Sequence, residues 1–300
     1  MSLFSLILPD FLLIALGCAL LRTKILSPDF FNHAERLVYY ILFPALLFLS
    51  LAKAPLDPSN SLTLMGAALF LVLSGIALSW LMVPVFRPDP LVHASLGQCA
   101  YRFNTYIGLS LSGSLMGTEG QGLIAIMVGV TVPVVNFAAV HALSRQQGAN
   151  VLRESLRNPL ILATLAGMLF NLSGLELPGP IAATLSRLGA CAIAIGLLCV
   201  GASLTLSFEP RKGTLGICIS TIIIRLMLMP LCALLIAQVL HLPIAEQQIL
   251  VLFAALPTAS AAYVLATRMG GDGKLVALIM TSTTLLSALT LPFWLSIVAH

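Results

Sequence analysis

Long apolar runs separated by short polar stretches recur along the whole chain. Ten runs are long enough to cross the roughly 30 Å hydrocarbon core of a bilayer. They cover residues 3–21, 37–54, 62–85, 91–116, 123–143, 159–175, 180–206, 215–240, 245–267 and 275–298. The pattern predicts an all-α polytopic membrane protein with ten transmembrane helices.

Composition supports a lipid-exposed surface. Hydrophobic residues make up 59% of the 300 positions and charged residues only 9%, whereas a soluble domain carries roughly 25% charged residues. The net charge of +4 is therefore no sign of a nucleic-acid partner, and we expect none. The first run has no basic residue before it and is interrupted by Pro9 and Asp10, so we expect it to be retained and not cleaved as a signal peptide.

Basic residues are distributed unequally between the connections. With the segments numbered in order, the odd-numbered connections are those between segments 1 and 2, 3 and 4, 5 and 6, 7 and 8, and 9 and 10. They carry eleven of the fifteen Lys and Arg residues. The even-numbered connections, together with the segment ends beside them, carry only Lys53 and Arg187. Because cytoplasmic connections are enriched in Lys and Arg, we expect the odd-numbered ones to be cytoplasmic and both termini to lie outside.

The two halves of the chain share a spacing. Four residues of the first half recur 150 positions later: Pro9 and Pro159, Gly17 and Gly167, Pro28 and Pro178, Gln98 and Gln248. Since each half holds five segments, a duplication would invert the second half, as in many secondary transporters. We predict a first repeat at residues 1–143, a cytoplasmic linker at 144–158 and an inverted repeat at 159–300. Chance spacing is the alternative.

Segments 4 and 9 are polar or helix-breaking in the middle, at residues 101–108 and 255–260. Asn104 and Thr105 are good N-cap residues for a helix that restarts through Gly108. In segment 9, Pro257 removes a helical hydrogen bond, and Thr258 and Ser260 offer hydroxyl groups that can cap the restart. Helix N-termini bind anions, so the two breaks predict a carboxylate site. Back-bonding of the two hydroxyl groups to their own helix is the alternative.

Two arginines lie deep inside segments. Arg102 is about 17 Å into segment 4 and Arg225 about 15 Å into segment 8, at a rise of 1.5 Å per residue. Asp10 is the only acid well inside a segment, so the cations outnumber the acids at bilayer depth, as an organic-anion site would require. For Arg102 we expect a substrate role. For Arg225 we favour a structural role, in which it binds helix C-terminal carbonyl groups.

Other polar positions, among them Asp10 and Tyr263, are weaker candidates for the substrate site. Asn136 in segment 5 and the run Thr281–Thr284 in segment 10 either line the same cavity or join helices at close approach. All six cysteines lie inside apolar segments without ligand spacing, so we expect no metal site and no cofactor. Soluble-enzyme motifs and a nucleotide-binding loop are missing from the sequence, and we expect no enzyme and no ATP-driven pump.

At the two breaks the sequence resembles the auxin efflux carrier family. The run from Arg102 through Asn104 to Gly108 is similar to that family's Arg-x-Asn-x-x-x-Gly motif, and Pro257 to Tyr263 is similar to its second crossover motif. Residues 37–46 resemble its second helix. Phe103 stands where Gly is frequent, and Ser110 stands where Pro often follows.

The resemblance implies a ten-helix fold like that of the bile acid:sodium symporters. Helices 1, 2, 6 and 7 would form a scaffold, and helices 3–5 and 8–10 a moving transport unit. Asn104 and Pro257 would mark the crossover and touch a small organic anion, moved without ATP by an elevator-like alternation. A homodimer through the scaffold is expected by analogy. Because Phe103 would narrow the pocket, plant-type auxin is disfavoured as substrate.

We therefore expect a secondary transporter of the bacterial inner membrane that exports or exchanges a small carboxylate. Coupling to Na⁺ or H⁺ is left open. A sodium-coupled organic-anion symporter is the first alternative, and only Gln98 and Gln248 hint at its ion site. A membrane sensor or an intramembrane enzyme is the second alternative, but no signalling domain or catalytic pair is visible.

Overall fold

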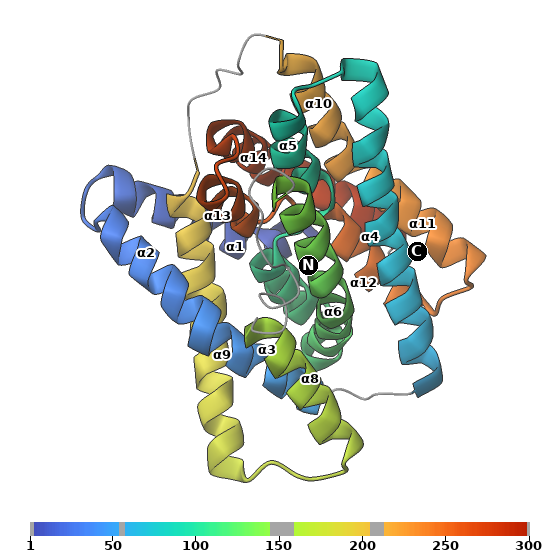
Figure 1. Cartoon of the computed structure of the whole chain (residues 1–300). Helices are drawn as coiled ribbons and strands as arrows, with labels where there is room; N and C mark the ends of the chain where they lie inside the picture. Colours follow the sequence, from blue (N-terminus) through green and yellow to red (C-terminus); the bar gives the residue numbers. More distant parts are fainter. Residues whose placement is uncertain (1–2, 54–57, 145–158, 205–212, 299–300) are drawn as a thin grey trace. The chain divides into compact units, whose positions relative to one another are not determined.

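The computed structural model describes residues 3–53, 58–144, 159–204 and 213–298, and no strand occurs among them. In chain order the elements, including two π-helical turns labelled η, are α1 (Leu3–Arg22), α2 (Pro28–Leu37), η1 (Val38–Leu42), α3 (Phe43–Ala52), α4 (Pro58–Phe86), α5 (Pro90–Tyr101), α6 (Thr105–Ser144), α8 (Pro159–Leu172), α9 (Gly179–Ala202), α10 (Leu215–Ile223), η2 (Ile224–Leu228), α11 (Met229–Val239), α12 (Ile244–Ala255), α13 (Ser260–Arg268) and α14 (Gly273–Val298) (Figure 1). The predicted linker, apart from Ser144, lies outside the described residues.

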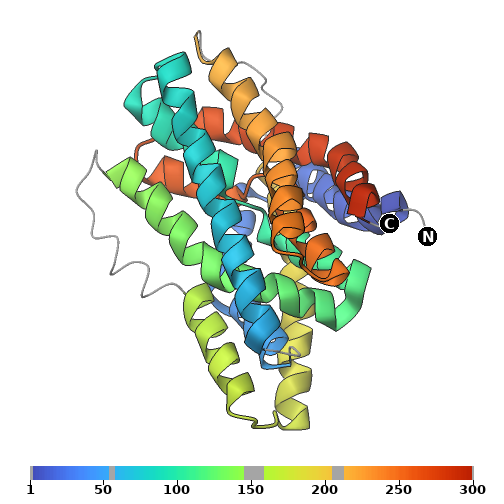
Figure 2. The ribbon, with the colours of Figure 1, turned by 90° about the vertical axis from the view of Figure 1, so that its right-hand side faces the viewer.

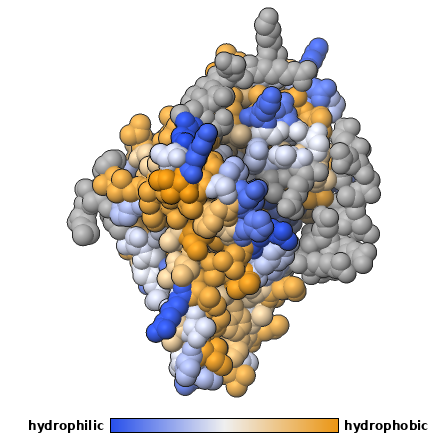
Figure 3. Space-filling view, turned by 90° about the vertical axis from the view of Figure 1, so that its left-hand side faces the viewer, coloured by the Kyte–Doolittle hydropathy of each residue, from blue (hydrophilic) through white to orange (hydrophobic). Residues whose placement is uncertain are grey.

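Five of the described helices are long and apolar enough to cross a membrane. They cover Leu62–Phe86, Thr105–Leu143, Gly179–Ala202, Leu215–Val239 and Gly273–Val298. Large apolar side chains also point outward, among them Leu169 at 68%, Phe70 at 62% and Leu289 at 71% exposure. Apolar side chains cover much of the face in Figure 3. The structure is thus all-helical in its described part and has the surface of a polytopic membrane protein.

Two helix boundaries differ from the sequence-based prediction. Segment 2 begins at Pro28, not at residue 37, because Ser27 caps the helix by accepting a hydrogen bond from the Phe30 N–H group (3.2 Å). No loop separates segments 4 and 5. Instead α6 bends sharply at Gly117, whose φ of 59° and ψ of −139° are non-helical, a conformation that glycine adopts without a Cβ penalty.

The chain forms two compact units. Unit 1 comprises residues 1–62, 106–129 and 154–203. In it α3 packs along α8 and α9, and α1 packs along α9. The Asn171 side chain of α8 donates hydrogen bonds to the carbonyl oxygens of Leu51 (2.9 Å) and Ala52 (3.1 Å), which satisfies the end of α3. The four segments expected to form a scaffold lie in this unit as far as residue 203, together with residues 106–129 of α6.

Glycines bring α1 and α9 into close contact. A Cβ atom at Gly201 would overlap the carbonyl oxygen of Ile14, and one at Gly17 would overlap that of Leu198. Small residues at helix interfaces allow backbones to approach closely in membranes.

We therefore expect Gly201→Val to separate α1 from α9 and to lower stability by about 1–3 kcal/mol, the usual cost of overpacking. Thermal unfolding in detergent measures the change. Gly66→Val is the control, because nothing lies within 4 Å of a Cβ there. Equal melting temperatures for the two variants would contradict the proposed contact.

Unit 2 comprises residues 63–105, 130–153 and 204–300. Figure 2 shows α10, η2 and α11 as one continuous helix. Pro230 lacks the N–H group that would bond to the Leu226 carbonyl, and the indole N–H of Trp294 on α14 donates to that oxygen instead (2.8 Å). Helix α12 packs against α11 and α14, and α5 packs against α10, α13 and α14. Helices α5 and α12, which end at the two predicted breaks, are therefore packed among the other helices of unit 2.

Candidate functional site

The two predicted helix breaks are present and lie against each other in unit 2. Helix α5 ends at Tyr101 and α6 begins at Thr105, while α12 ends at Ala255 and α13 begins at Ser260. The two short connections form an isolated antiparallel bridge between Phe103 and Thr258. We call residues 102–104 and 256–259 the crossover.

Backbone hydrogen bonds hold the crossover together. The Asn104 N–H group donates to the Pro257 carbonyl (2.9 Å), and the Ala259 N–H group donates to the Arg102 carbonyl (3.3 Å). Leu256 is extended, with φ −58° and ψ 142°, because the following Pro257 disfavours the helical conformation. Buried backbone polar groups need hydrogen-bond partners within the protein, and the bridge provides that pairing.

Arg225 of η2 binds the C-terminal ends of both interrupted helices. Its Nε atom donates to the Leu256 carbonyl (2.6 Å) and its Nη2 atom to those of Phe253 (3.2 Å) and Ala254 (3.0 Å). Its Nη1 atom donates to the Ala100 carbonyl of α5 (3.4 Å). The positive charge therefore lies at the negative ends of two helix dipoles. This geometry is that of the structural role favoured for Arg225.

Thr258 does not cap the restart of α13 as expected. Its hydroxyl donates to the Cys99 carbonyl in the last turn of α5 (2.9 Å), and its N–H group donates to Thr283 Oγ1 of α14 (3.2 Å). Ala259 occupies the N-cap position of α13, without a side-chain cap. The hydroxyl is committed to α5 because that carbonyl, at the end of a helix, has no helical N–H partner.

Arg102 extends toward two amide side chains. Its Nη1 atom donates to Gln98 Oε1 (3.2 Å), and its Nη2 atom donates to Asn136 Oδ1 of α6 (3.0 Å). The arginine fixes the orientation of the Gln98 amide, because only the oxygen of that group accepts a hydrogen bond. The Gln98 Nε2 atom is buried without an acceptor among the described residues.

The structure thus brings together most of the predicted site residues. Within unit 2, Arg102, Asn104, Pro257, Thr258 and Ser260 are buried, Asn136 contacts Arg102, and Thr105 is half-buried. Three predicted residues lie apart from these contacts. Tyr263 is half-buried on α13, Gly108 is buried in unit 1, and Asp10 accepts a hydrogen bond from Ser110.

Gln98 is the residue that sequence reasoning undervalued. It appeared only as one member of a repeated spacing and as a hint of a sodium site. Its position four residues before Arg102 places the two side chains on one face of a helix, a signal that was available in the sequence. Gln248, its supposed partner, instead donates to the Val298 carbonyl (3.1 Å).

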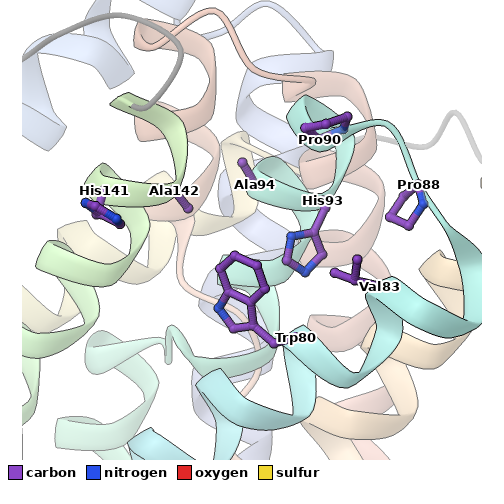
Figure 4. A pocket seen from close by; sticks show the side chains of 8 residues that line it. All are labelled: Trp80, Val83, Pro88, Pro90, His93, Ala94, His141 and Ala142. Atoms are coloured by element: carbon purple, nitrogen blue, oxygen red, sulfur yellow. The ribbon is translucent and has the colours of Figure 1, made fainter.

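A separate cavity of about 380 Å³ opens elsewhere in unit 2 (Figure 4). It is lined by Trp80, Val83, Pro88, Pro90, His93, Ala94, His141 and Ala142. The His93 Nε2–H group donates to the Ser79 carbonyl (2.9 Å). The centroid of the His93 ring lies 5.0 Å from that of the Trp80 ring. The lining is mostly apolar and contains no Lys or Arg, so it suits an organic anion less well than the surroundings of Arg102.

Comparison with known proteins places the chain among transporters. The family described as membrane transport protein matches residues 2–150 and 143–295. The chain is 28% identical over 296 residues to an uncharacterized transporter of Methanothermobacter thermautotrophicus, a match covering 96% of each chain. It is 22% identical over 306 residues to the uncharacterized transporter YfdV of Escherichia coli, which covers 96% of this chain and 95% of that protein.

Proposed function

Because this chain belongs to the membrane transport protein family, that of the auxin efflux carriers, we propose that it is a secondary carrier for a small carboxylate. In this proposal it spans the bacterial inner membrane ten times as two inverted five-helix repeats, with both termini outside. It exports or exchanges its substrate by an elevator-like alternation. The helices of unit 2 carry the substrate and those of unit 1 serve as the scaffold.

The buried N–H group of Gln98 beside Arg102 carries the proposal. An unsatisfied buried donor costs about 1–3 kcal/mol, and such groups in proteins call for a specific explanation. A carboxylate oxygen would satisfy this donor and would benefit from the neighbouring guanidinium charge. A neutral acceptor would gain less, because it lacks the charge attraction to the guanidinium group, and a cation would be repelled by that group.

The start of α13 supplies a second attraction for an anion. The first N–H groups of a helix have no helical acceptor and lie at the positive end of the helix dipole. Here the N-cap residue is Ala259, whose methyl side chain cannot accept a hydrogen bond from them. Broken helices with free N-termini hold substrate carboxylates in other transporters.

The same contacts support an anion over a sodium ion near Gln98. A sodium site needs oxygen ligands, yet the Gln98 oxygen accepts a hydrogen bond from Arg102. A cation at that oxygen would also be repelled by the guanidinium group. These contacts therefore favour a carboxylate over a sodium ion beside Gln98, one of the two residues that hinted at a sodium site.

The test is transport by the purified protein in proteoliposomes. A thermal-shift screen against mono- and dicarboxylates identifies ligands, since a bound ligand stabilises by mass action. Uptake of radiolabelled malonate, succinate and acetate then follows. If none of these anions stabilises the protein or enters the vesicles, the proposed function is wrong.

Asn104→Ala should lower uptake of the transported anion by roughly 10-fold or more, as expected when a hydrogen bond of about 1.5 kcal/mol or more to a charged group is lost. The backbone hydrogen bond from residue 104 to Pro257 survives in alanine, so the melting temperature without ligand should stay near that of the unmodified protein. Asn32→Ala, on the exposed surface of α2, is the control. If Asn104→Ala takes up the anion as fast as the unmodified protein, Asn104 does not contribute to the substrate site.

A further inference from the structure

Unit 1 contains a buried carboxylate that the proposed anion site does not use. Asp10 of α1 is only 6% exposed. Its Oδ1 atom accepts a hydrogen bond from the Ser110 hydroxyl of α6 (2.6 Å). Its Oδ2 atom is buried and has no hydrogen-bond partner among the described residues. One half of the carboxylate is therefore satisfied and the other half is not.

An ionised carboxylate in this position is costly. Burying an uncompensated charge is far more unfavourable than burying a neutral acid, and ionisable residues at bilayer depth mark ion or proton pathways. The charged and titratable side chains on the described helices around Asp10 in unit 1 are Cys18 and Arg22 on α1, Asp29, His33, Glu35 and Arg36 on α2, Tyr106 and Glu119 on α6, and Arg187, Cys191 and Cys199 on α9. Arg22, Glu119 and Arg187 are exposed.

The partner of Asp10 lies on the helix that leaves the crossover. Ser110 is in the second turn of α6, which begins at Thr105. The hydrogen bond from Ser110 to an ionised Asp10 is charge-assisted and therefore strong. Protonation of Asp10 removes that assistance. The protonation state of Asp10 thus sets how firmly the first turns of α6 are bound to α1.

We propose that Asp10 is a proton-binding site and that its protonation couples a proton to anion transport. Proton binding by Asp10 is independent of the proposed function, and only the coupling to anion transport rests on it. One proton passes from water to Asp10 Oδ2, the carboxylate becomes a neutral acid, and the hydrogen bond from Ser110 to Oδ1 weakens. Release of the proton restores the ionised carboxylate and the strong hydrogen bond to α6.

Proton binding is measured first, without any transported anion. Infrared difference spectra of the full chain in lipid, recorded between high and low pH, should show a carboxylic-acid C=O band. Asp10→Asn should lose that band, and Glu119→Gln, which removes an exposed carboxylate of α6, should keep it. If the Asp10→Asn spectrum matches that of the unmodified protein, Asp10 does not titrate and the inference is wrong.

Coupling is measured next, with malonate as the probe in proteoliposomes. An imposed pH gradient should stimulate net uptake by the unmodified protein and by Glu119→Gln. Asp10→Asn imitates the protonated acid, so it should keep malonate exchange at equal pH and lose the stimulation. Stimulation that persists in Asp10→Asn would overturn the coupling.

The two measurements separate the inference from the function on which it rests. If the unmodified protein exchanges none of the radiolabelled anions, the carrier function fails whatever the spectra show, and the coupling fails with it. If exchange is present but the pH gradient has no effect on the unmodified protein, the carrier function stands and the coupling alone is overturned.

Discussion

Arg225→Met is expected to destabilise the protein by about 3–5 kcal/mol, the cost of removing one partner from a buried charged contact. The methionine side chain is also unbranched near the backbone, but it is shorter and has no donor, so the carbonyl groups of Ala100, Phe253, Ala254 and Leu256 would lose their hydrogen bonds to Arg225. Each buried acceptor left unsatisfied costs about 1–3 kcal/mol. Thermal unfolding in detergent measures the loss.

Two further variants show whether charge or geometry matters. Arg225→Lys keeps the charge, but a single ammonium group lacks the planar fork that reaches both helix ends, so we expect intermediate stability. Arg187→Met removes an exposed arginine of α9 and should change the melting temperature little. A melting temperature of Arg225→Met equal to that of Arg187→Met would show that Arg225 does not hold the crossover.

Arg102→Gln is expected to weaken anion binding by about 10- to 100-fold. This range corresponds to the loss of a hydrogen bond to a charged group, about 1.5–3 kcal/mol, at 1.36 kcal/mol per factor of ten. Glutamine retains an amide that can donate to Gln98 or Asn136, so most of the local packing should survive. Calorimetric titration with the anion found by the thermal-shift screen measures the dissociation constant.

The controls for Arg102 separate binding from folding. Arg187→Gln should bind the anion as the unmodified protein does. The affinity of Arg102→Lys for the anion should lie between those of the unmodified protein and Arg102→Gln, since lysine keeps the charge without the guanidinium fork. If Arg102→Gln melts at a much lower temperature without ligand but binds the anion normally when folded, the role of Arg102 is structural and the proposed site is wrong.

Much of the fold follows from local sequence signals. The apolar runs predicted most helices to within a few residues, because an apolar segment in the hydrocarbon core of a bilayer satisfies its own backbone hydrogen bonds as a helix. Pro257 and the polar run from Arg102 to Thr105 correctly located both breaks. The start of α2 was missed because Ser27–Pro28 begins a helix whose first ten residues are amphipathic, outside the apolar run.

The partners of the site residues were beyond the reach of sequence reasoning. That Arg225 joins Ala100 to Phe253 depends on packing between segments distant in the chain. Likewise, the Thr258 hydroxyl meets α5 and not its own helix. Spacing along one helix is predictable, as for Gln98 and Arg102, but contacts between helices depend on tertiary structure.

Phe103 and Ser110, the two positions at which the sequence departs from the family motif, each make a contact in the structure. The Phe103 ring lies 4.1 Å, between ring centroids, from that of Phe253 and so packs onto α12. Ser110, where proline is frequent, supplies the hydroxyl bound by Asp10. A proline at residue 110 would have no donor for that carboxylate.

The contacts of Arg225 also bear on how the protein is made. They join residues 100, 225 and 253–256, which emerge from the ribosome at widely separated times. Domains and their parts fold as the chain is synthesised, N-terminal first. Helix α5 therefore enters the membrane with its Ala100 carbonyl not yet bound by Arg225, and the crossover is completed only after α12 has followed. A chain truncated before α12 would lack the structure that holds the first break.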